Sequence, residues 1–74
     1  MDLHAVVHVA LLDEGVDCWR PVSARRIREN VFVLEGSVPD DERWEFVPGQ
    51  AVVCEPHQFS DGSQGIVAVR IALS

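Results

Sequence analysis

Histidine and cysteine are the residues of this chain that could bind a metal or act as nucleophiles, and there are only three and two of them. His4 and His8 stand four positions apart, but the pattern around them is that of a strand. Four residues of strand span about 13 Å, whereas the ligands of one zinc ion each lie about 2 Å from the metal. Cys18, Cys54 and His57 could approach one another only through the fold. We therefore predict no metal site, no cofactor, and reduced thiols at both cysteines.

Groups that could carry out catalysis are equally sparse. A cysteine nucleophile needs a basic neighbour or a helix N-terminus to lower the pKa of its thiol, and neither Cys18 nor Cys54 stands at a predicted helix start. The G-x-S-x-G motif of serine hydrolases does not occur. The carboxylates stand mostly in predicted loops, whereas a general acid–base pair needs a sheltered cleft, and a small barrel offers little of one. The sequence thus predicts a protein that is not an enzyme and has no catalytic residues.

Carboxylates gather in two predicted loops, and a tryptophan follows each loop. In a small barrel these loops would flank one groove, and acidic loops beside aromatic rings suit a Pro-rich segment that carries Arg or Lys. The alternative for the carboxylates is a solvated face that maintains solubility, and for the tryptophans a place in the core. The residues predicted to bind a protein are Asp13, Glu14, Asp17, Trp19, Asp40, Asp41, Glu42 and Trp44.

All six basic residues are arginine, and four of them follow Trp19 closely. Small barrels can bind single-stranded nucleic acid through basic side chains and stacked aromatic rings. The formal net charge of -6 opposes a polyanionic partner or an anionic membrane. A contiguous arginine face beside an exposed aromatic residue would favour nucleic-acid binding, whereas arginines dispersed into ion pairs would favour protein binding. This alternative nucleic-acid site consists of Arg20, Arg25, Arg26 and Arg28.

The composition indicates one small globular domain. The chain has 74 residues, of which 47% are hydrophobic, too many for a disordered segment. The first residues lack the basic region of a targeting signal, and the apolar run over 5–12 contains His8 and is too short to span a bilayer. Two cysteines are too few for a disulfide framework. These features predict a cytoplasmic protein without a membrane partner.

Apolar and polar residues alternate with a period of two along several segments, which predicts strands. The segment 18–28 fits a strand only if it contains a bulge, and Pro21, which cannot donate to a ladder, marks either that bulge or a strand edge. A short helical turn over 23–28 is the alternative. Turns are expected at 29–30 and at Pro48-Gly49, with a polar loop over 56–65. The predicted strands are 5–12, 18–28, 31–34, 44–46, 51–55 and 66–73.

Short strands at roughly ten-residue spacing indicate a sandwich or a barrel. Because the chain is too short for two full sheets, we predict an all-β fold over residues 1–74, a small SH3-like barrel of about five to six antiparallel strands. The predicted core consists of Val7, Val9, Leu11, Val22, Phe32, Leu34, Phe46, Val52, Val67, Val69 and Ile71.

Two stretches of the sequence carry a resemblance that runs over most of the chain. They are D-E-G-x-D-x-W-R-P-V over 13–22 and W-E-F-x-P-G over 44–49, with Val53-Cys54-Glu55 after them. They resemble a family of small, uncharacterised bacterial proteins with an SH3-like fold, which implies a bacterial source and brings no catalytic residues. We therefore expect a protein-interaction module whose partner is a basic protein or peptide, or a second copy of the chain. The alternative is a barrel that binds single-stranded nucleic acid.

Overall fold

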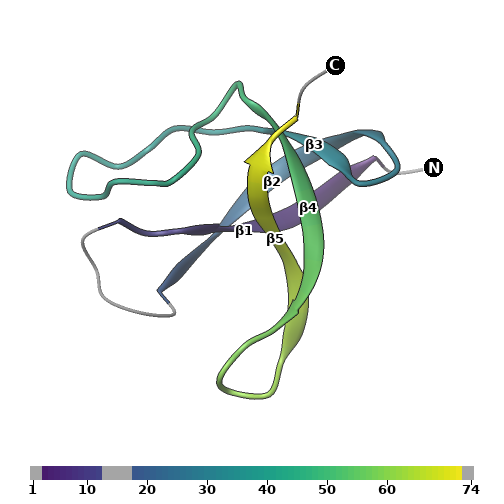
Figure 1. Ribbon diagram of the computed structural model, residues 1–74. Helices are drawn as coiled ribbons and strands as arrows, with labels where there is room; N and C mark the ends of the chain where they lie inside the picture. The colour runs from purple at the N-terminus through teal and green to yellow at the C-terminus, as the bar shows by residue number, and fades with distance from the viewer. Residues whose placement is uncertain (1–2, 13–17, 73–74) are drawn as a thin grey trace.

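The computed structural model describes residues 3–12 and 18–72, and within them the regular structure consists of five strands (Figure 1). Strands that follow one another in the chain pair in antiparallel fashion, and the first pairs with the last in parallel, which closes the barrel. The predicted all-β, SH3-like barrel is confirmed, although one strand pair is parallel. The strands are β1 (His4–Ala10), β2 (Trp19–Arg28), β3 (Val31–Leu34), β4 (Ala51–Gln58) and β5 (Gln64–Ile71).

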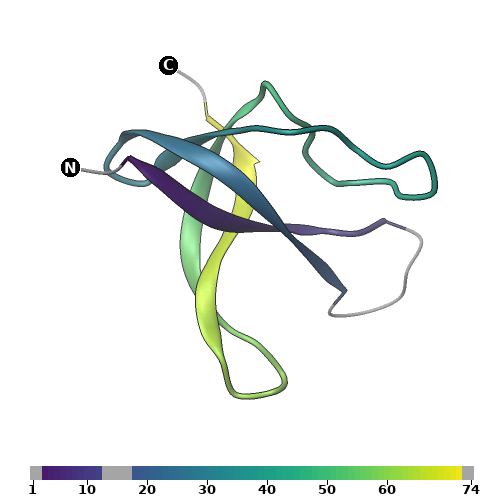
Figure 2. The same cartoon turned by 180° about the vertical axis from the view of Figure 1, so that it is seen from behind.

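The strands differ strongly in length, and the connections between them project from two sides of the barrel. The β4–β5 hairpin extends well beyond the barrel, whereas the β3–β4 connection reaches out on the same side as the end of β1 and the start of β2 (Figures 1 and 2). No helix that could cross a membrane occurs within residues 3–12 and 18–72.

The core is formed by the inward side chains of all five strands, and the β3–β4 connection adds two aromatic rings to it. Most predicted core residues lie there, and Leu11 packs against them while partly buried. Val67 is buried but lies outside the main cluster. The cluster comprises Val7, Val9, Val22, Ala24, Phe32, Leu34, Trp44, Phe46, Val52, Cys54 and Ala68.

The predicted core is wrong at the end of β5, because this strand contains a bulge. Ala68 lies opposite Cys54 and Arg70 opposite Val53, so Val69 is an extra residue without an opposite neighbour. Val69 is 37% exposed and Ile71 40% exposed, whereas Ala68 is only 2% exposed. Bulky and small residues alternate along β5, and the prediction placed the bulky ones inside. A narrow barrel can instead have small side chains at inward positions.

The bulge predicted in β2 is confirmed, and it lies near the end of the strand. The register shifts between Arg26 and Arg28, which leaves Ile27 as the extra residue. The alternative helical turn over 23–28 is wrong, since these residues belong to the strand. Pro21 pairs with His8 in an undisturbed register and so does not mark the bulge.

Two further segments differ from the predictions. The predicted strand 44–46 is a single bridge between Leu11 and Trp44, so a sixth strand does not form among the described residues. β4 continues to Gln58 because Pro56, His57 and Gln58 still pair with β5. The turn at Pro48-Gly49 forms as expected, with the φ of Gly49 at 92°.

Candidate functional site

A groove with a volume of about 330 Å³ lies between β2 and the β3–β4 connection. The groove exists because β3 has only four residues and pairs with β2 from Ala24 onward. The half of β2 before Ala24 therefore has β1 on one side and, within residues 3–12 and 18–72, no strand on the other. Beyond β3, the chain turns away at Gly36, whose φ is 95°. The groove is lined by Arg20, Pro21, Val22, Ser23, Glu35, Gly36, Ser37, Pro39 and Trp44.

An ion pair ties the β3–β4 connection to β2 at this groove. The guanidinium of Arg20 contacts both carboxylate oxygens of Glu42, with Nε 3.1 Å from Oε1. The same Oε1 accepts a hydrogen bond of 2.9 Å from Trp44 Nε1. The hydrogen bond from Arg20, and next the one from Trp44, lower the pKa of Glu42, and Glu42 raises the pKa of Arg20 in turn. Glu42 is therefore an ionised carboxylate that two hydrogen-bond donors fix in place and whose charge Arg20 neutralises.

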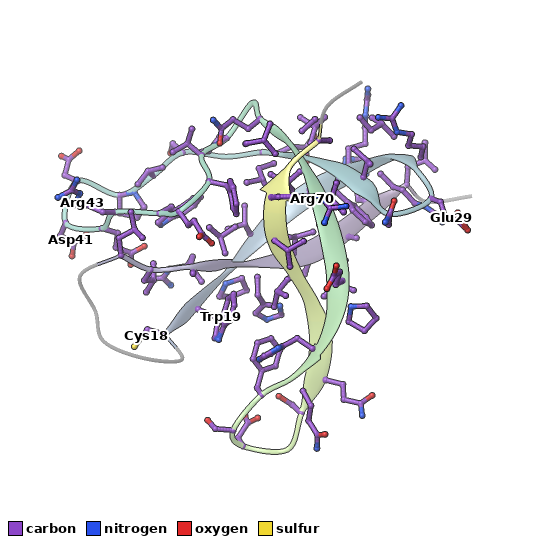
Figure 3. The ribbon with its side chains drawn as sticks, viewed as in Figure 1. Cys18, Trp19, Glu29, Asp41, Arg43 and Arg70 are labelled. Carbon is purple, nitrogen blue, oxygen red and sulfur yellow. The ribbon has the colours of Figure 1, made fainter. Side chains whose placement is uncertain are left out.

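The predicted protein-binding residues do not all lie at this groove. Asp40 and Asp41 are exposed in the β3–β4 connection, and Figure 3 shows Asp41 at its outer end near Arg43. Trp44 lies in the core with one edge on the groove, 8% exposed. Trp19 is half-buried and does not line the groove. The remaining three carboxylates, Asp13, Glu14 and Asp17, lie outside the described residues.

Four half-buried rings, those of Trp19, His57, Phe59 and His8, form a cluster that was not predicted from the sequence. The ring centroids lie 5.3 Å apart for Trp19 and His57, 4.9 Å for His57 and Phe59, and 4.7 Å for Phe59 and His8. Figure 3 shows Trp19 in the sector between β2 and the β4–β5 hairpin. A Cβ at Gly65 would lie 3.1 Å from the His8 ring and 3.2 Å from Phe59, so glycine permits this packing.

The indole N–H of Trp19 is buried and has no hydrogen-bond partner among the described residues. A buried donor without an acceptor carries a free-energy cost of about 1–3 kcal/mol. His8 Nδ1, in contrast, lies 3.2 Å from the carbonyl oxygen of Ile66. The signal that could have revealed the cluster is the strand register, which brings residues from β1, β2 and β4 together, and the register cannot be read from spacing alone.

The arginines of the alternative site are divided between two ends of β2. Arg20 is paired with Glu42, whereas Arg25, Arg26 and Arg28 are exposed and make no ion pair with another described residue. Figure 3 shows Trp19 and Glu29 at opposite ends of β2. Six residues of strand separate Trp19 from Arg25, roughly 20 Å. The structure therefore does not join all four arginines into one face beside the half-buried rings.

The cysteines lie in different surroundings. Cys54 belongs to the core, where burial raises the pKa of its thiol to about 11. Cys18 is half-buried just before β2, and Figure 3 shows it at the far end of the β1–β2 hairpin. In the described part of the chain both side chains are thiols, and no three His, Cys, Asp or Glu residues come together as metal ligands. That the purified protein carries no zinc stays a prediction, which elemental analysis would test.

Comparison of the chain with protein-family models, with curated proteins and with solved structures finds no match.

Proposed function

We propose that the chain is a non-enzymatic protein-interaction module, and that its groove binds an extended, basic segment of a partner protein. The observation that carries this proposal is the groove itself, where apolar surface from the exposed Pro21 and Pro39 and from the edge of Trp44 lies along an unpaired strand edge. Extended peptides bind such edges through their backbone and such apolar surface through their side chains.

The charge around the groove supports a basic partner. From Glu35 to Trp44 the chain carries four carboxylates and one arginine. Arg20 and Glu42 neutralise each other, so the remaining charges of this segment are three carboxylates, Glu35, Asp40 and Asp41, against one guanidinium, a net negative charge. Negative surface of this kind accelerates the association of a cationic partner, and added salt weakens the effect.

The source and compartment belong to the same proposal. The stretches over 13–22 and 44–49 resemble a bacterial family with an SH3-like fold, and the two thiols suit a reducing compartment. We therefore place the protein in a bacterial cytoplasm. The genes that neighbour it in its source genome would supply candidate partners, each of which should contain an exposed segment rich in Arg or Lys.

A selection of random twelve-residue peptides displayed on phage tests the groove directly. We expect the intact protein to enrich peptides in which Arg or Lys alternates with apolar residues. The groove-filling variant Ser37→Trp should lose their binding, because Ser37 lines the groove. The matched control Ser60→Trp adds the same ring at an exposed site that is outside the groove lining and should bind normally. Enrichment that survives Ser37→Trp, or no enrichment of basic peptides, would contradict the proposal.

The contribution of charge is measured with a second variant. Asp40→Asn with Asp41→Asn removes two exposed carboxylates and leaves Glu42 to hold Arg20 and Trp44. Association with a selected basic peptide should slow, and its dependence on salt should flatten, while the fold stays intact. Unchanged association rates at low and at high salt would exclude these carboxylates from the encounter.

Single-stranded nucleic acid is the second candidate, because Arg25, Arg26 and Arg28 are exposed and unpaired by described carboxylates. A fluorescent oligo(dT) of about fifteen nucleotides provides the test at roughly 0.15 M salt. We expect no binding there, since the formal net charge of the chain is -6. Binding that disappears when the three arginines become glutamines would establish this function in place of the first.

A further inference from the structure

The backbone of β2 determines which polar groups face the groove. Leu11 N donates to Cys18 O at 2.9 Å, which fixes the hydrogen-bonding phase of the β1–β2 pair. From Cys18 onward, even-numbered residues of β2 direct their backbone groups toward β1, and odd-numbered residues direct theirs the other way. Ser23 agrees with this phase, since its carbonyl accepts Glu35 N at 2.9 Å on the β3 side.

Trp19 and Pro21 are the two odd-numbered residues that remain at the unpaired edge. Trp19 directs an N–H and a carbonyl toward that side, whereas Pro21 has a carbonyl and no N–H. Trp19 and Pro21 therefore offer two acceptors and one donor, and the N–H of Ser23, which has no backbone partner among the described residues, adds a second donor. Proline at a free strand edge also opposes uncontrolled edge-to-edge pairing, because it interrupts the row of donors.

We infer that the partner segment binds as an additional β-strand along the edge from Trp19 to Ser23, donating a backbone N–H to the carbonyl of Pro21. This inference rests on the proposed function and specifies how the groove holds its peptide. Only every second residue of an added strand directs its N–H toward β2. The side chains of the added strand would then alternate between the groove wall at Trp44 and solvent, where cationic side chains meet the net negative charge of the β3–β4 connection.

A second copy of the chain is a poor occupant of this edge. A symmetric antiparallel pair centred on Pro21 would oppose two residues that lack an N–H. It would also bring together the Glu35, Asp40 and Asp41 carboxylates of both copies, and like charges that lie close together repel each other. The chemistry of the edge thus favours a cationic segment of another protein.

A series of N-methylated peptides tests the inference. The probe is the heptapeptide Arg-Val-Arg-Val-Arg-Val-Arg with both ends blocked, and each backbone nitrogen is methylated in a separate peptide. Binding is followed by NMR titration of the isotope-labelled full chain. Methylation at alternate positions should weaken binding by about tenfold, since one hydrogen bond is lost. Methylation at the intervening positions should change binding by less than about threefold.

The outcomes separate the two proposals. An effect of N-methylation that alternates along the peptide, together with shifts of the Trp19 and Ser23 amide signals and loss of binding in Ser37→Trp, would support strand addition. Binding in the groove without alternation would overturn strand addition and leave the proposed function standing. No shift at groove residues with the probe at millimolar concentration would overturn both. Dimerisation of the chain through the same edge, detected by sedimentation without peptide, would identify a second copy as the occupant and overturn the inference.

Discussion

Replacing either of two neighbouring residues of β5 by aspartate gives a sharp test of the bulge in that strand. Alternation alone predicts that Val69→Asp unfolds the domain, because it makes Val69 a core residue. The structure reverses this expectation. Ala68 faces Cys54 in the core and is 2% exposed, while Val69 is the extra residue of the bulge and is 37% exposed. We expect Ala68→Asp to unfold the domain and Val69→Asp to remain folded.

The magnitudes follow from burial. At about 0.05–0.15 kcal/mol per residue, a chain of 74 residues has a stability of roughly 4–11 kcal/mol. Full burial of a valine side chain contributes about 1.5–3 kcal/mol, and Val69 is only partly buried, so its replacement should cost about 1–2 kcal/mol. A carboxylate at Ala68 would be buried without a described partner and should cost at least about 3–5 kcal/mol. The second cost is comparable to the whole stability of the domain.

Urea denaturation followed by near-UV circular dichroism at pH 7 measures both variants. The control pair is Ala68→Asn and Val69→Asn, which separates the effect of charge from that of size and polarity. A native spectrum for Ala68→Asp, or loss of more than about 3 kcal/mol in Val69→Asp, would refute the assigned facing of β5.

Further measurements address the thiol, the ion pair and the unpaired indole. Burial raises the pKa of Cys54 from 9.0 to about 11, so the thiolate fraction at pH 8 is about a hundredfold lower in the folded chain than in the unfolded chain. A disulfide reagent should therefore label Cys54 far more slowly in buffer than in urea, and equal labelling rates would contradict its burial. Stability should also fall above about pH 9, where the unfolded thiol ionises and the folded one does not. Because the pKa of Glu42 is lowered, its pairing with Arg20 stabilises the fold above about pH 4.5, and this stabilisation is lost as pH falls through the folded-state pKa. In thermal melts from pH 7 to pH 3, the melting temperature should therefore fall less steeply with pH for Glu42→Gln than for the original chain. The same pH dependence in both proteins would contradict the pairing. Trp19→Phe removes a buried donor that has no partner among the described residues and should change stability by less than about 1 kcal/mol. Trp44→Phe breaks a hydrogen bond and should be the more destabilising of the two.

The alternation of β1 and the apolar run of β3 were enough to predict four of the eleven cluster residues, namely Val7, Val9, Phe32 and Leu34. Spacing could not predict the position of Val69, since a bulge shifts the phase of a strand without leaving a mark in composition. The strand predicted over 44–46 failed for a different reason. Phe46 is buried as predicted, whereas Trp44, predicted to bind a protein, is buried as well and reaches the sheet through one bridge instead of a ladder.

The candidate site was predictable only in part. The sequence predicted a groove flanked by two acidic loops, whereas the observed groove lies between β2 and the β3–β4 connection and has Trp44, but not Asp40 or Asp41, in its lining. The pairing of Glu42 with Arg20 could not be read from the sequence, because it depends on how the β3–β4 connection folds back against β2. The unpaired edge of β2 depends likewise on where β3 stops, which is a property of the pairing and not of either strand alone.

The closing of the barrel has a consequence for how the chain folds. β1 and β5 join through only two residue pairs, Val7 with Ile66 and His8 with Val67, and the contact from His8 Nδ1 to Ile66 O links positions 58 residues apart. The other pairs in the barrel join strands that follow one another in the chain, so their loops close at lower entropic cost. The β1–β5 seam should therefore form last, slow the overall folding rate, and open first when the native state fluctuates. Hydrogen exchange should report this seam as the least protected ladder of the barrel.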